Sequence, residues 1–434
     1  MTGDLPMTLR AYRKLSAAAL PLSSALIHRR LKQGKEDPAR VNERRGISSS
    51  ARPPGPLVWI HGASVGEVLA AAALVDRLRA LNIRILMTSG TVTSAEIVTG
   101  RFPPDVLHQY LPYDTPRYVD RFLDHWQPTL ALLVESDLWP NLIMSCAERR
   151  VPMVIINGRM SQRSFPRWQK AQATIGALLG RLDFVLAQSG SDAERFASLG
   201  ARDVINTGNL KLDVEAPSAD RDKLDRMLAL LRGRPVIVAA STHAGEEAIV
   251  IGAHRKLATY LPALMTVVIP RHPKRGGEIV ELAASAGLQT AQRSREQMPS
   301  AQTDIYVADT IGEMGLFYRL APIVFMGGSL VAHGGQNPIE AIKLGASIIH
   351  GPHIQNFTEV YGALDRTGGA RQVDNGEMLV RQIGQWLSDA ALRQQSNDSA
   401  VAVVEQLGGA LERTLAALEP YLLQLRLEAG AADA

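Results

Sequence analysis

Short, continuously apolar runs alternate with segments of helical periodicity along most of this 434-residue chain. A strand that is apolar throughout is buried on both faces, which is typical of a parallel sheet between two layers of helices. Because parallel crossovers are right-handed, the pattern predicts doubly wound, Rossmann-like α/β structure. In the first half the expected strands are Leu57–Ile60, Ile83–Met87, Leu130–Val134, Met153–Ile156 and Phe184–Ala187, and the expected helices are Val68–Leu81, Asn141–Arg149 and Asp192–Leu199.

The pattern stops at a polar stretch, Asp213–Asp225, and then starts again. A chain of this length suggests more than one domain. We therefore predict two doubly wound domains, residues 47–213 and 214–400, facing each other across a cleft, and a C-terminal helix at 401–434. In the second half the expected strands are Val236–Ala240, Met265–Ile269, Ile323–Met326 and Ser347–His350, and the expected helices are Glu246–Leu257, Pro338–Leu344 and Val401–Leu427.

Residues 1–46 are strongly basic. Their ten Lys or Arg and four acidic residues give a net charge of +6, against +4 for the whole chain. Their apolar run, Leu15–Ile27, is shorter than the roughly 20 residues of a membrane-spanning helix. A basic segment on a nearly neutral body favours an anionic membrane surface over nucleic acid bound along the protein. The alternative is a helix packed on the first domain.

The membrane interpretation predicts that the segment can be removed. A chain starting near Arg45 should then gain solubility and lose affinity for anionic liposomes, yet keep its activity. If removal changes neither property, the segment is part of the fold.

A glycine-containing turn, His61-Gly62-Ala63-Ser64-Val65-Gly66-Glu67, follows the first apolar run. Its glycines let the backbone turn tightly and approach a ligand. Glu67 falls at the start of the next helix, where a carboxylate could take a proton from an acceptor hydroxyl. The structural alternative is that Glu67 only stabilises the helix N-terminus.

Charged side chains also follow two other strands of the first half. Glu135 comes directly after a buried strand, a costly placement for a carboxylate without partners, although a structural capping network would supply them. Residues 157–168 hold three arginines, among them Arg159 and Arg163, with aromatic residues between them. They could bind phosphates or single-stranded nucleic acid, or form a solvated basic face. Lys211 closes the first domain.

In the second half, Arg271 follows a strand and is well placed to pair with a phosphate. The strongest local signal is Gly327-Gly328-Ser329 followed by residues 334–340. A glycine-rich loop offers free N–H groups to an anion, and the following helix adds its dipole. Glu340, one turn into that helix, could accept hydrogen bonds from ribose hydroxyls. The alternative is a glycine turn and a helix-favouring acid.

The sequence predicts neither a metal site nor a cofactor. Cys146 is the only cysteine, and the chain has no Walker A motif and no H-E-x-x-H motif. Five histidines of the second half show no metal-ligand spacing and are interpreted as hydrogen-bonding or core residues. They are His243, His272, His333, His350 and His353.

Taken in order, these motifs resemble those of the Kdo (3-deoxy-D-manno-octulosonic acid) transferases of lipopolysaccharide synthesis. The resemblance covers nearly the whole chain, and its eight collinear motifs are specific together, although each is weak alone. The matching stretches are WIHGASVGE (59–67), YLPYD (110–114), ESDLWPNLI (135–143), INGRMSQRSF (156–165), TGNLKLD (207–213), PRHPKR (270–275), DTIGEMG (309–315) and FMGGSLVAHGGQNPIEA (325–341).

The resemblance implies a GT-B glycosyltransferase with an acceptor-binding N-terminal domain and a CMP-Kdo-binding C-terminal domain. It implies inverting transfer of Kdo from CMP-Kdo to a lipid A precursor (lipid IVA). The implied place is the cytoplasmic face of the inner membrane, with peripheral or N-terminally anchored attachment and no nucleic-acid partner. Relatives often have a more hydrophobic N-terminal anchor than Leu15–Ile27.

The resemblance also implies roles for individual residues. Glu67 matches the proposed catalytic base and Glu135 a second essential acid. The acceptor-binding residues would be Ser64, Gly66, Arg159 and Arg163. The donor-binding residues would be Lys211, Arg271, His272, Pro273, Gly312, Glu313, Met314, Gly315, Gly327, Gly328, Ser329, Asn337 and Glu340.

Two alternatives remain. One is another GT-B enzyme, such as a nucleotide-sugar epimerase or a transferase that uses a UDP-sugar. The other is a non-catalytic protein whose arginine and aromatic segment binds RNA or lipid, in which case Glu67 would be free to vary without loss of binding.

Overall fold

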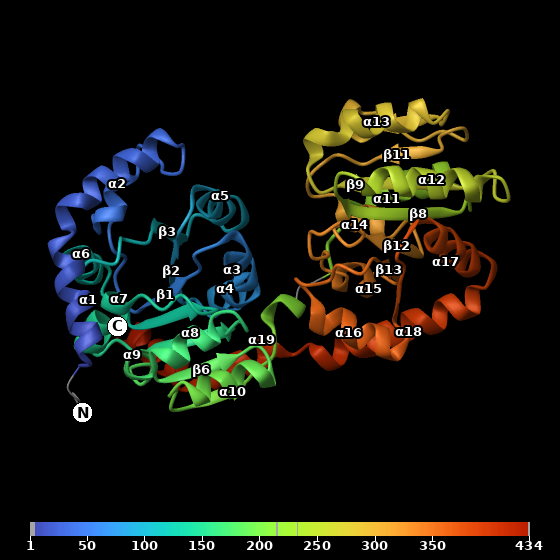
Figure 1. Ribbon diagram of the computed structural model, residues 1–434. Coiled ribbons are helices and arrows are strands. Elements are labelled where there is room, and N and C mark those ends of the chain that lie inside the picture. Colours follow the sequence, from blue (N-terminus) through green and yellow to red (C-terminus); the bar gives the residue numbers. More distant parts are fainter. Residues whose placement is uncertain (1–4, 214–215, 232, 433–434) are drawn as a thin grey trace. The chain divides into compact units, whose positions relative to one another are not determined.

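A computed structural model describes residues 5–213, 216–231 and 233–432 of the chain (Figure 1). The chain forms two compact units. The first contains residues 1–213 and 408–434, and the second contains residues 214–407. Each unit is a parallel sheet of seven strands with helices on both faces, which confirms the predicted α/β class.

The sheet of the first unit has the strand order β3-β2-β1-β4-β5-β6-β7. Its strands are β1 (Leu57–His61), β2 (Arg84–Ser89), β3 (Val106–Tyr110), β4 (Leu130–Val134), β5 (Met153–Gly158), β6 (Phe184–Ala187) and β7 (Val204–Asn206). Its helices are α1 (Met7–Ala18), α2 (Leu20–Lys32), η1 (Val41–Arg45), α3 (Val65–Ala70), α4 (Ala72–Ala80), α5 (Val92–Arg101), α6 (Pro116–Trp126), α7 (Pro140–Glu148), α8 (Phe165–Lys170), α9 (Gln172–Leu179), α10 (Gly190–Ser198), η2 (Leu210–Leu212) and α19 (Ala410–Ala432).

The central strand β1 is buried on both faces, as its continuous apolar pattern predicts. Val58 and Ile60 belong to a core cluster that includes residues of α3, α4 and α19. Leu57 and Trp59 belong to a second cluster with residues of α1, α6, α7 and α9. Alternate side chains of one strand therefore enter two cores, and the sheet is held rigidly between two helical layers.

The sheet of the second unit has the order β10-β11-β9-β8-β12-β13-β14. Its strands are β8 (Val236–Thr242), β9 (Met265–Pro270), β10 (Thr290–Gln292), β11 (Ile305–Val307), β12 (Ile323–Met326), β13 (Ser347–His350) and β14 (Ala370–Gln372). Its helices are α11 (Arg221–Leu231), α12 (Glu246–Ala258), η3 (Pro273–Arg275), α13 (Gly276–Ser285), η4 (Arg293–Arg295), α14 (Met314–Tyr318), α15 (Ile339–Lys343), α16 (Thr358–Thr367), α17 (Gly376–Ser388) and α18 (Ala390–Leu407).

The C-terminal helix expected over 401–434 is wrong as a single element. Helix α18 ends at Leu407 and α19 begins at Ala410, with a left-handed Gly409 between them. Leu418 and Leu422 of α19 are buried in a core cluster of the first unit. The chain thus returns to the first unit after completing the second. The helix expected over Val68–Leu81 is likewise two helices, α3 and α4.

The N-terminal segment packs on the first unit. Leu9 of α1 is 1% exposed, and the Tyr12 hydroxyl donates to Asp114 at 2.9 Å. On α2, Ile27 is 2% exposed and the Ser23 hydroxyl lies 2.8 Å from that of Tyr118. No helix in the described part of the chain combines the length and apolar character needed to cross a bilayer.

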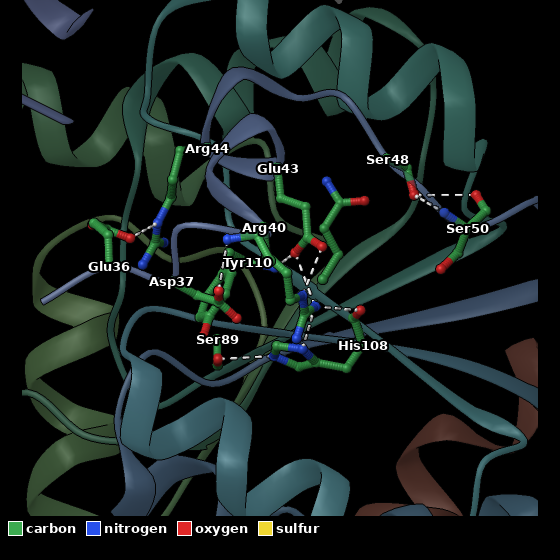
Figure 2. Close-up of polar contacts among 12 residues, drawn as sticks. Glu36, Asp37, Arg40, Glu43, Arg44, Ser48, Ser50, Ser89, His108 and Tyr110 are labelled. Carbon is green, nitrogen blue, oxygen red and sulfur yellow. Dashed lines mark hydrogen bonds and ion pairs between the residues drawn. The ribbon is translucent and has the colours of Figure 1, made fainter. Parts of the chain in front are cut away.

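Residues 36–46 are built into the edge of the first sheet (Figure 2). Arg44 is 4% exposed, pairs with the buried Glu36 at 2.8 Å and donates to the Leu111 carbonyl. The Arg40 and Arg44 guanidinium groups lie 4.7 and 4.6 Å from the centre of the Tyr110 ring. A chain starting near Arg45 would lose the buried Arg44–Glu36 pair at this edge of the sheet, which argues against the expectation that it keeps its activity.

Candidate active site

The first candidate catalytic group, Glu67, lies just past the carboxyl end of β1. Ser64 is the N-cap of α3, and its hydroxyl donates to Glu67 Oε1 at 2.7 Å. The Ala63 N–H donates to Glu67 Oε2 at 2.8 Å. This is close to a capping box, so the structural alternative for Glu67 is present in the molecule. The carboxylate is only half-buried, which leaves it accessible to a ligand.

Burial raises the pKa of Glu67 above its usual value, and nearby Asp137 and Glu135 act in the same direction. The hydrogen bonds from Ser64 and Ala63 oppose them. A helix cap alone would not need a neighbourhood of acids that destabilises its charge. A carboxylate whose pKa is raised is suited to general-base work, because it holds a proton more tightly once it has taken one.

Glu135 follows β4, the strand next to β1. Its φ of 63° is in the left-handed region, which is costly for a residue with a side chain and recurs at functional sites. Lys211 of η2 pairs with Glu135 at 2.7 Å. The structure thus brings Glu135 to the same sheet edge as Glu67. It places Lys211 on the first unit, against Glu135.

Two residues at this edge were not among the predicted site residues. His61 is fully buried, and its Nδ1 lies 2.8 Å from the Thr88 hydroxyl. Its Nε2 lies 3.4 Å from Asp137 Oδ2, but neither of these buried atoms has a hydrogen-bond partner in the described part of the chain. His61 ends β1 and Asp137 comes three residues after the end of the adjacent β4, so the two could have been predicted to meet, since parallel strands end at one edge.

The turn also has the form G-x-S-x-G, from Gly62 to Gly66, which hydrolases use for a nucleophilic serine. In that elbow the serine is strained and is paired with a histidine. Ser64 has an ordinary extended φ of −112°, and its hydroxyl donates to Glu67. The geometry therefore fits an N-cap and not a hydrolase nucleophile. Gly66 lies inside α3 and is exposed.

A chain of hydrogen bonds links the N-terminal segment to Glu67. Arg44 donates to the Gly90 carbonyl at 2.7 Å, and the Gly90 N–H donates to the Ala63 carbonyl at 3.0 Å. Ala63 in turn donates to Glu67. A Cβ on Gly90 would lie 2.8 Å from the Ala63 oxygen, so only glycine allows this approach. Arg44 therefore supports the turn that holds Glu67.

Arg159 and Arg163 lie in the exposed loop after β5. Neither side chain has a hydrogen bond or ion pair within the described residues, so nothing in the fold uses their charges.

In the second unit, the expectation of free N–H groups on the glycine-rich loop is wrong for its first part, Gly327-Gly328-Ser329. Glu246, fully buried at the start of α12, accepts hydrogen bonds from the N–H groups of Gly328, Ser329, Leu330 and His243 at 2.7–3.0 Å. The Gly327 N–H donates to the Ala240 carbonyl. The chain's own carboxylate thus occupies the place expected for a ligand anion. Ser329 is fully buried, and its role is structural.

Other donor-binding candidates lie at the carboxyl ends of the second sheet's strands. Arg271 and His272 are exposed after β9, and Pro273 begins η3. Asn337 Oδ1 accepts from the Ile339 N–H at 3.1 Å, which starts α15. Burial raises the pKa of Glu340, and no hydrogen bond to its side chain occurs in the described part of the chain. A half-buried carboxylate without a partner is suited to ligand hydroxyls.

The turn at Gly312–Gly315 is fixed by Glu313. Its carboxylate pairs with Arg293 at 2.7 Å and with Lys223 at 2.8 Å. The hydrogen bond from Arg293 holds the pKa of Glu313 well below its usual range, although burial opposes it. Its side chain is thus already paired, and only the backbone of the turn, which includes Gly312 and Met314, is left for a ligand. A Cβ on Gly315 would clash with the backbone of residues 217–218.

No group of three or more metal-ligating side chains occurs among the described residues. The sequence does contain one D-x-D triplet, Asp220-Arg221-Asp222, the form that often holds a metal with a diphosphate. Asp220 accepts from the Lys223 N–H at 3.0 Å and caps α11, so the triplet is explained by the helix.

Comparison with known proteins decides the family. Residues 39–214 match a family model described as "3-Deoxy-D-manno-octulosonic-acid transferase (kdotransferase)". The chain is 36% identical to the 3-deoxy-D-manno-octulosonic acid transferase of Haemophilus influenzae over 390 residues, which cover 88% of this chain and 91% of that protein. The chain belongs to the Kdo transferase family. The resemblance seen in the sequence is thereby confirmed, and the chain is a glycosyltransferase.

Two solved structures share the fold of this Kdo transferase family member at much lower sequence identity. A glycosyltransferase from Rickettsia africae has a TM-score of 0.58 at 13% identity, covering 86% of this chain and 99% of that one. A UDP-GlcNAc 2-epimerase from Neisseria meningitidis has a TM-score of 0.53 at 13% identity, covering 81% and 99%. At these identities the likeness shows the GT-B fold alone.

Proposed function

We propose that the protein transfers Kdo from CMP-Kdo to a lipid A precursor during lipopolysaccharide core synthesis. The observation that carries the proposal is the match to a Kdo transferase over 88% of the chain. It is supported by the cluster of Glu67, Glu135 and Asp137, which gives a transferase the base it requires.

The proposed reaction is a direct displacement that inverts the anomeric centre. Glu67 takes the proton of a sugar hydroxyl on the lipid acceptor as that oxygen attacks the anomeric carbon of Kdo. The bond from that carbon to the phosphate of CMP breaks, and CMP leaves with the bonding electrons. A positioned base contributes roughly 10²–10⁴-fold in rate.

On the donor side, Arg271 and His272 are proposed to bind the phosphate, and Glu340 to accept hydrogen bonds from the ribose hydroxyls. The leaving group is a monophosphate, which requires less neutralising charge than a diphosphate. Lys211 is proposed to stabilise the departing phosphate from the first unit, because its ammonium group is held there by Glu135.

The lipid acceptor is proposed to meet the protein at the cytoplasmic face of the inner membrane. Four apolar side chains of α1 and α2 are exposed, namely Met7 (85%), Leu15 (69%), Leu22 (70%) and Leu26 (47%). Lys14, Arg29 and Lys32 on the same helices are also exposed. Apolar side chains with basic neighbours suit attachment to an anionic lipid surface. The exposed Arg159 and Arg163 are proposed to bind the acceptor's phosphates.

Competition between donors tests the proposal against the other members of the fold class. Purified protein is supplied with a tetraacylated lipid A precursor and equal amounts of CMP-Kdo and a panel of UDP-sugars. The proposal requires the lipid to gain Kdo alone. Incorporation or epimerisation of a UDP-linked sugar would overturn the proposal and favour another GT-B enzyme.

A further inference from the structure

Three histidines from separate loops meet at the carboxyl edge of the second sheet. His243 follows β8, His272 follows β9 and His333 follows β12. The rings of His243 and His333 are stacked, with centroids 4.1 Å apart and an interplanar angle of 16°. The His272 ring lies 5.9 Å from that of His243, edge to face. The sequence predicts these histidines to be scattered hydrogen-bonding or core residues, and the structure brings the three together.

The position of His243 is fixed by its surroundings. Its backbone N–H donates to the buried Glu246, and its ring Nε2 lies 3.5 Å from Gln336 Nε2. Gly328 has a φ of +67°, and a Cβ there would come within 3.3 Å of both the His243 ring and Gln336. The glycine therefore leaves the space that the two side chains need. These contacts hold His243 in place, while His272 and His333 are exposed beside it.

The groups that lower the pKa of His243 are two arginines and two histidines, and the histidines are positive only when protonated. Arg271, Arg275 and His272 come from the loop after β9, and His333 from the loop after β12. On α12, Glu246 is occupied by four N–H groups, and the carboxylate of Glu247 pairs with Arg275 at 2.6 Å. Burial first, and then the neighbouring histidines and Arg271, lower the pKa of His243 to about 4. A ligand anion would relieve this repulsion.

We propose that His243 and His333 form a subsite for an oxyanion of the donor, beside the phosphate position at Arg271. The inference rests on the proposed function, because CMP-Kdo carries two such groups, the phosphate and the carboxylate of the sugar acid. Both are negatively charged near neutral pH and accept N–H hydrogen bonds from imidazole. The stacked pair would bind one of them from one side while Arg271 stays available for the other.

The subsite predicts a coupling between binding and protons. An anion stabilises the imidazolium form, so the pKa of His243 is higher in the complex than in the free protein. Binding then takes up a proton, and affinity rises as the pH falls from 7.5 to 5.5. The phosphodiester of CMP-Kdo stays ionised across this range, so the ligand itself does not contribute the change.

Calorimetric titration of His243→Gln and His333→Gln with cytidine, CMP and CMP-Kdo tests the inference, with His28→Gln, an exposed residue on α2, as control. Loss of one charge-assisted hydrogen bond is expected to weaken binding about tenfold. Weaker binding of both CMP and CMP-Kdo assigns the phosphate, and weaker binding of CMP-Kdo alone assigns the carboxylate. Cytidine binding and the control should not change, and the pH dependence of CMP-Kdo binding should be weaker in His243→Gln than in the wild type.

Two negative results are distinguishable. If the wild type binds CMP and CMP-Kdo but neither variant changes the affinity or its pH dependence, the subsite is refuted and the proposed function stands. If the wild type binds neither ligand, the proposed function fails and this inference fails with it.

Discussion

At the residue scale, the chemistry proposed for the first unit depends on acids that were predicted separately and that the fold brings together. Glu67 and Glu135 could be predicted because each follows an apolar strand, and strand ends in a parallel sheet share an edge. Asp137 was not predicted, although it follows the strand next to that of His61 and lies 3.4 Å from the His61 ring. Glu246 was not predicted either, because only tertiary structure brings the glycine loop onto it.

The acids around Glu67 predict a shift in the pH profile. Asp137 raises the pKa of Glu67, so Asp137→Asn should lower it. Because Glu67 must be deprotonated to act as a base, kcat/KM rises with pH through this pKa. The acid limb of the profile should therefore move to lower pH in Asp137→Asn and stay in place in Asp203→Asn, an exposed control. If the acid limb of the Asp137→Asn profile does not move, Glu67 is not the base whose deprotonation the profile records.

Glu246 predicts a stability effect in the second unit. In Glu246→Gln one acceptor oxygen becomes an amide donor that faces N–H groups, so at least two hydrogen bonds are lost in a buried place. The free energy of unfolding should fall by at least about 2 kcal/mol. Urea denaturation followed by circular dichroism measures it, with the exposed Glu281→Gln as control. Equal stability of the two variants would mean that the loop does not need this carboxylate.

At the scale of elements, the long apolar strands were predictable and the edges were not. The strands β1, β4, β5 and β12 lie at or within one or two residues of their predicted positions. The strands β7, β10, β11 and β14, each at or next to an edge of its sheet, have only three residues, too few for a period to be seen. The break between α18 and α19 was missed because Gly408-Gly409 interrupts a pattern that is helical on both sides.

The N-terminal segment was interpreted as a removable tail because the sequence gives its net charge but not which of its charges form buried ion pairs. Arg44 is buried with Glu36, which also pairs with Arg30, so Arg44→Ala removes one of the two cations beside this buried carboxylate and should cost about 1.5–3 kcal/mol. Arg45→Ala is the matched control, since that side chain only reaches Asn42 on the surface, and its effect should be within about 0.5 kcal/mol. Equal denaturation midpoints for the two variants would support the interpretation that the N-terminal segment can be removed.

The exposed leucines of the same segment should contribute to membrane binding without contributing to stability. Replacing Leu22 and Leu26 by Asp removes two exposed apolar contacts and adds negative charge. Flotation with anionic liposomes should therefore decrease while the melting temperature stays unchanged. A matched pair of Asp substitutions at the exposed Leu228 and Leu230 of α11 should leave flotation intact. Equal loss in both pairs would show that the effect is not specific to α2.

At the scale of the whole molecule, the proposed function assigns the general base to one α/β unit and the donor's anion site to the other. The two-unit architecture and the family were predictable because eight motifs follow the strands in a fixed order. Which side chains are free for a ligand was not predictable, because that depends on whether the protein's own groups, such as Glu246 and Arg293, already occupy them.

The most direct test is the mass of the lipid product. A tetraacylated lipid A precursor is incubated with CMP-Kdo supplied directly and with wild-type protein, Glu67→Gln or the exposed control Glu96→Gln. The account predicts that wild type and control add Kdo to the lipid, and that Glu67→Gln is slower by about 10²–10⁴-fold with an unchanged melting temperature. Transfer by Glu67→Gln at the wild-type rate, or no Kdo on the lipid with wild-type protein, would contradict it.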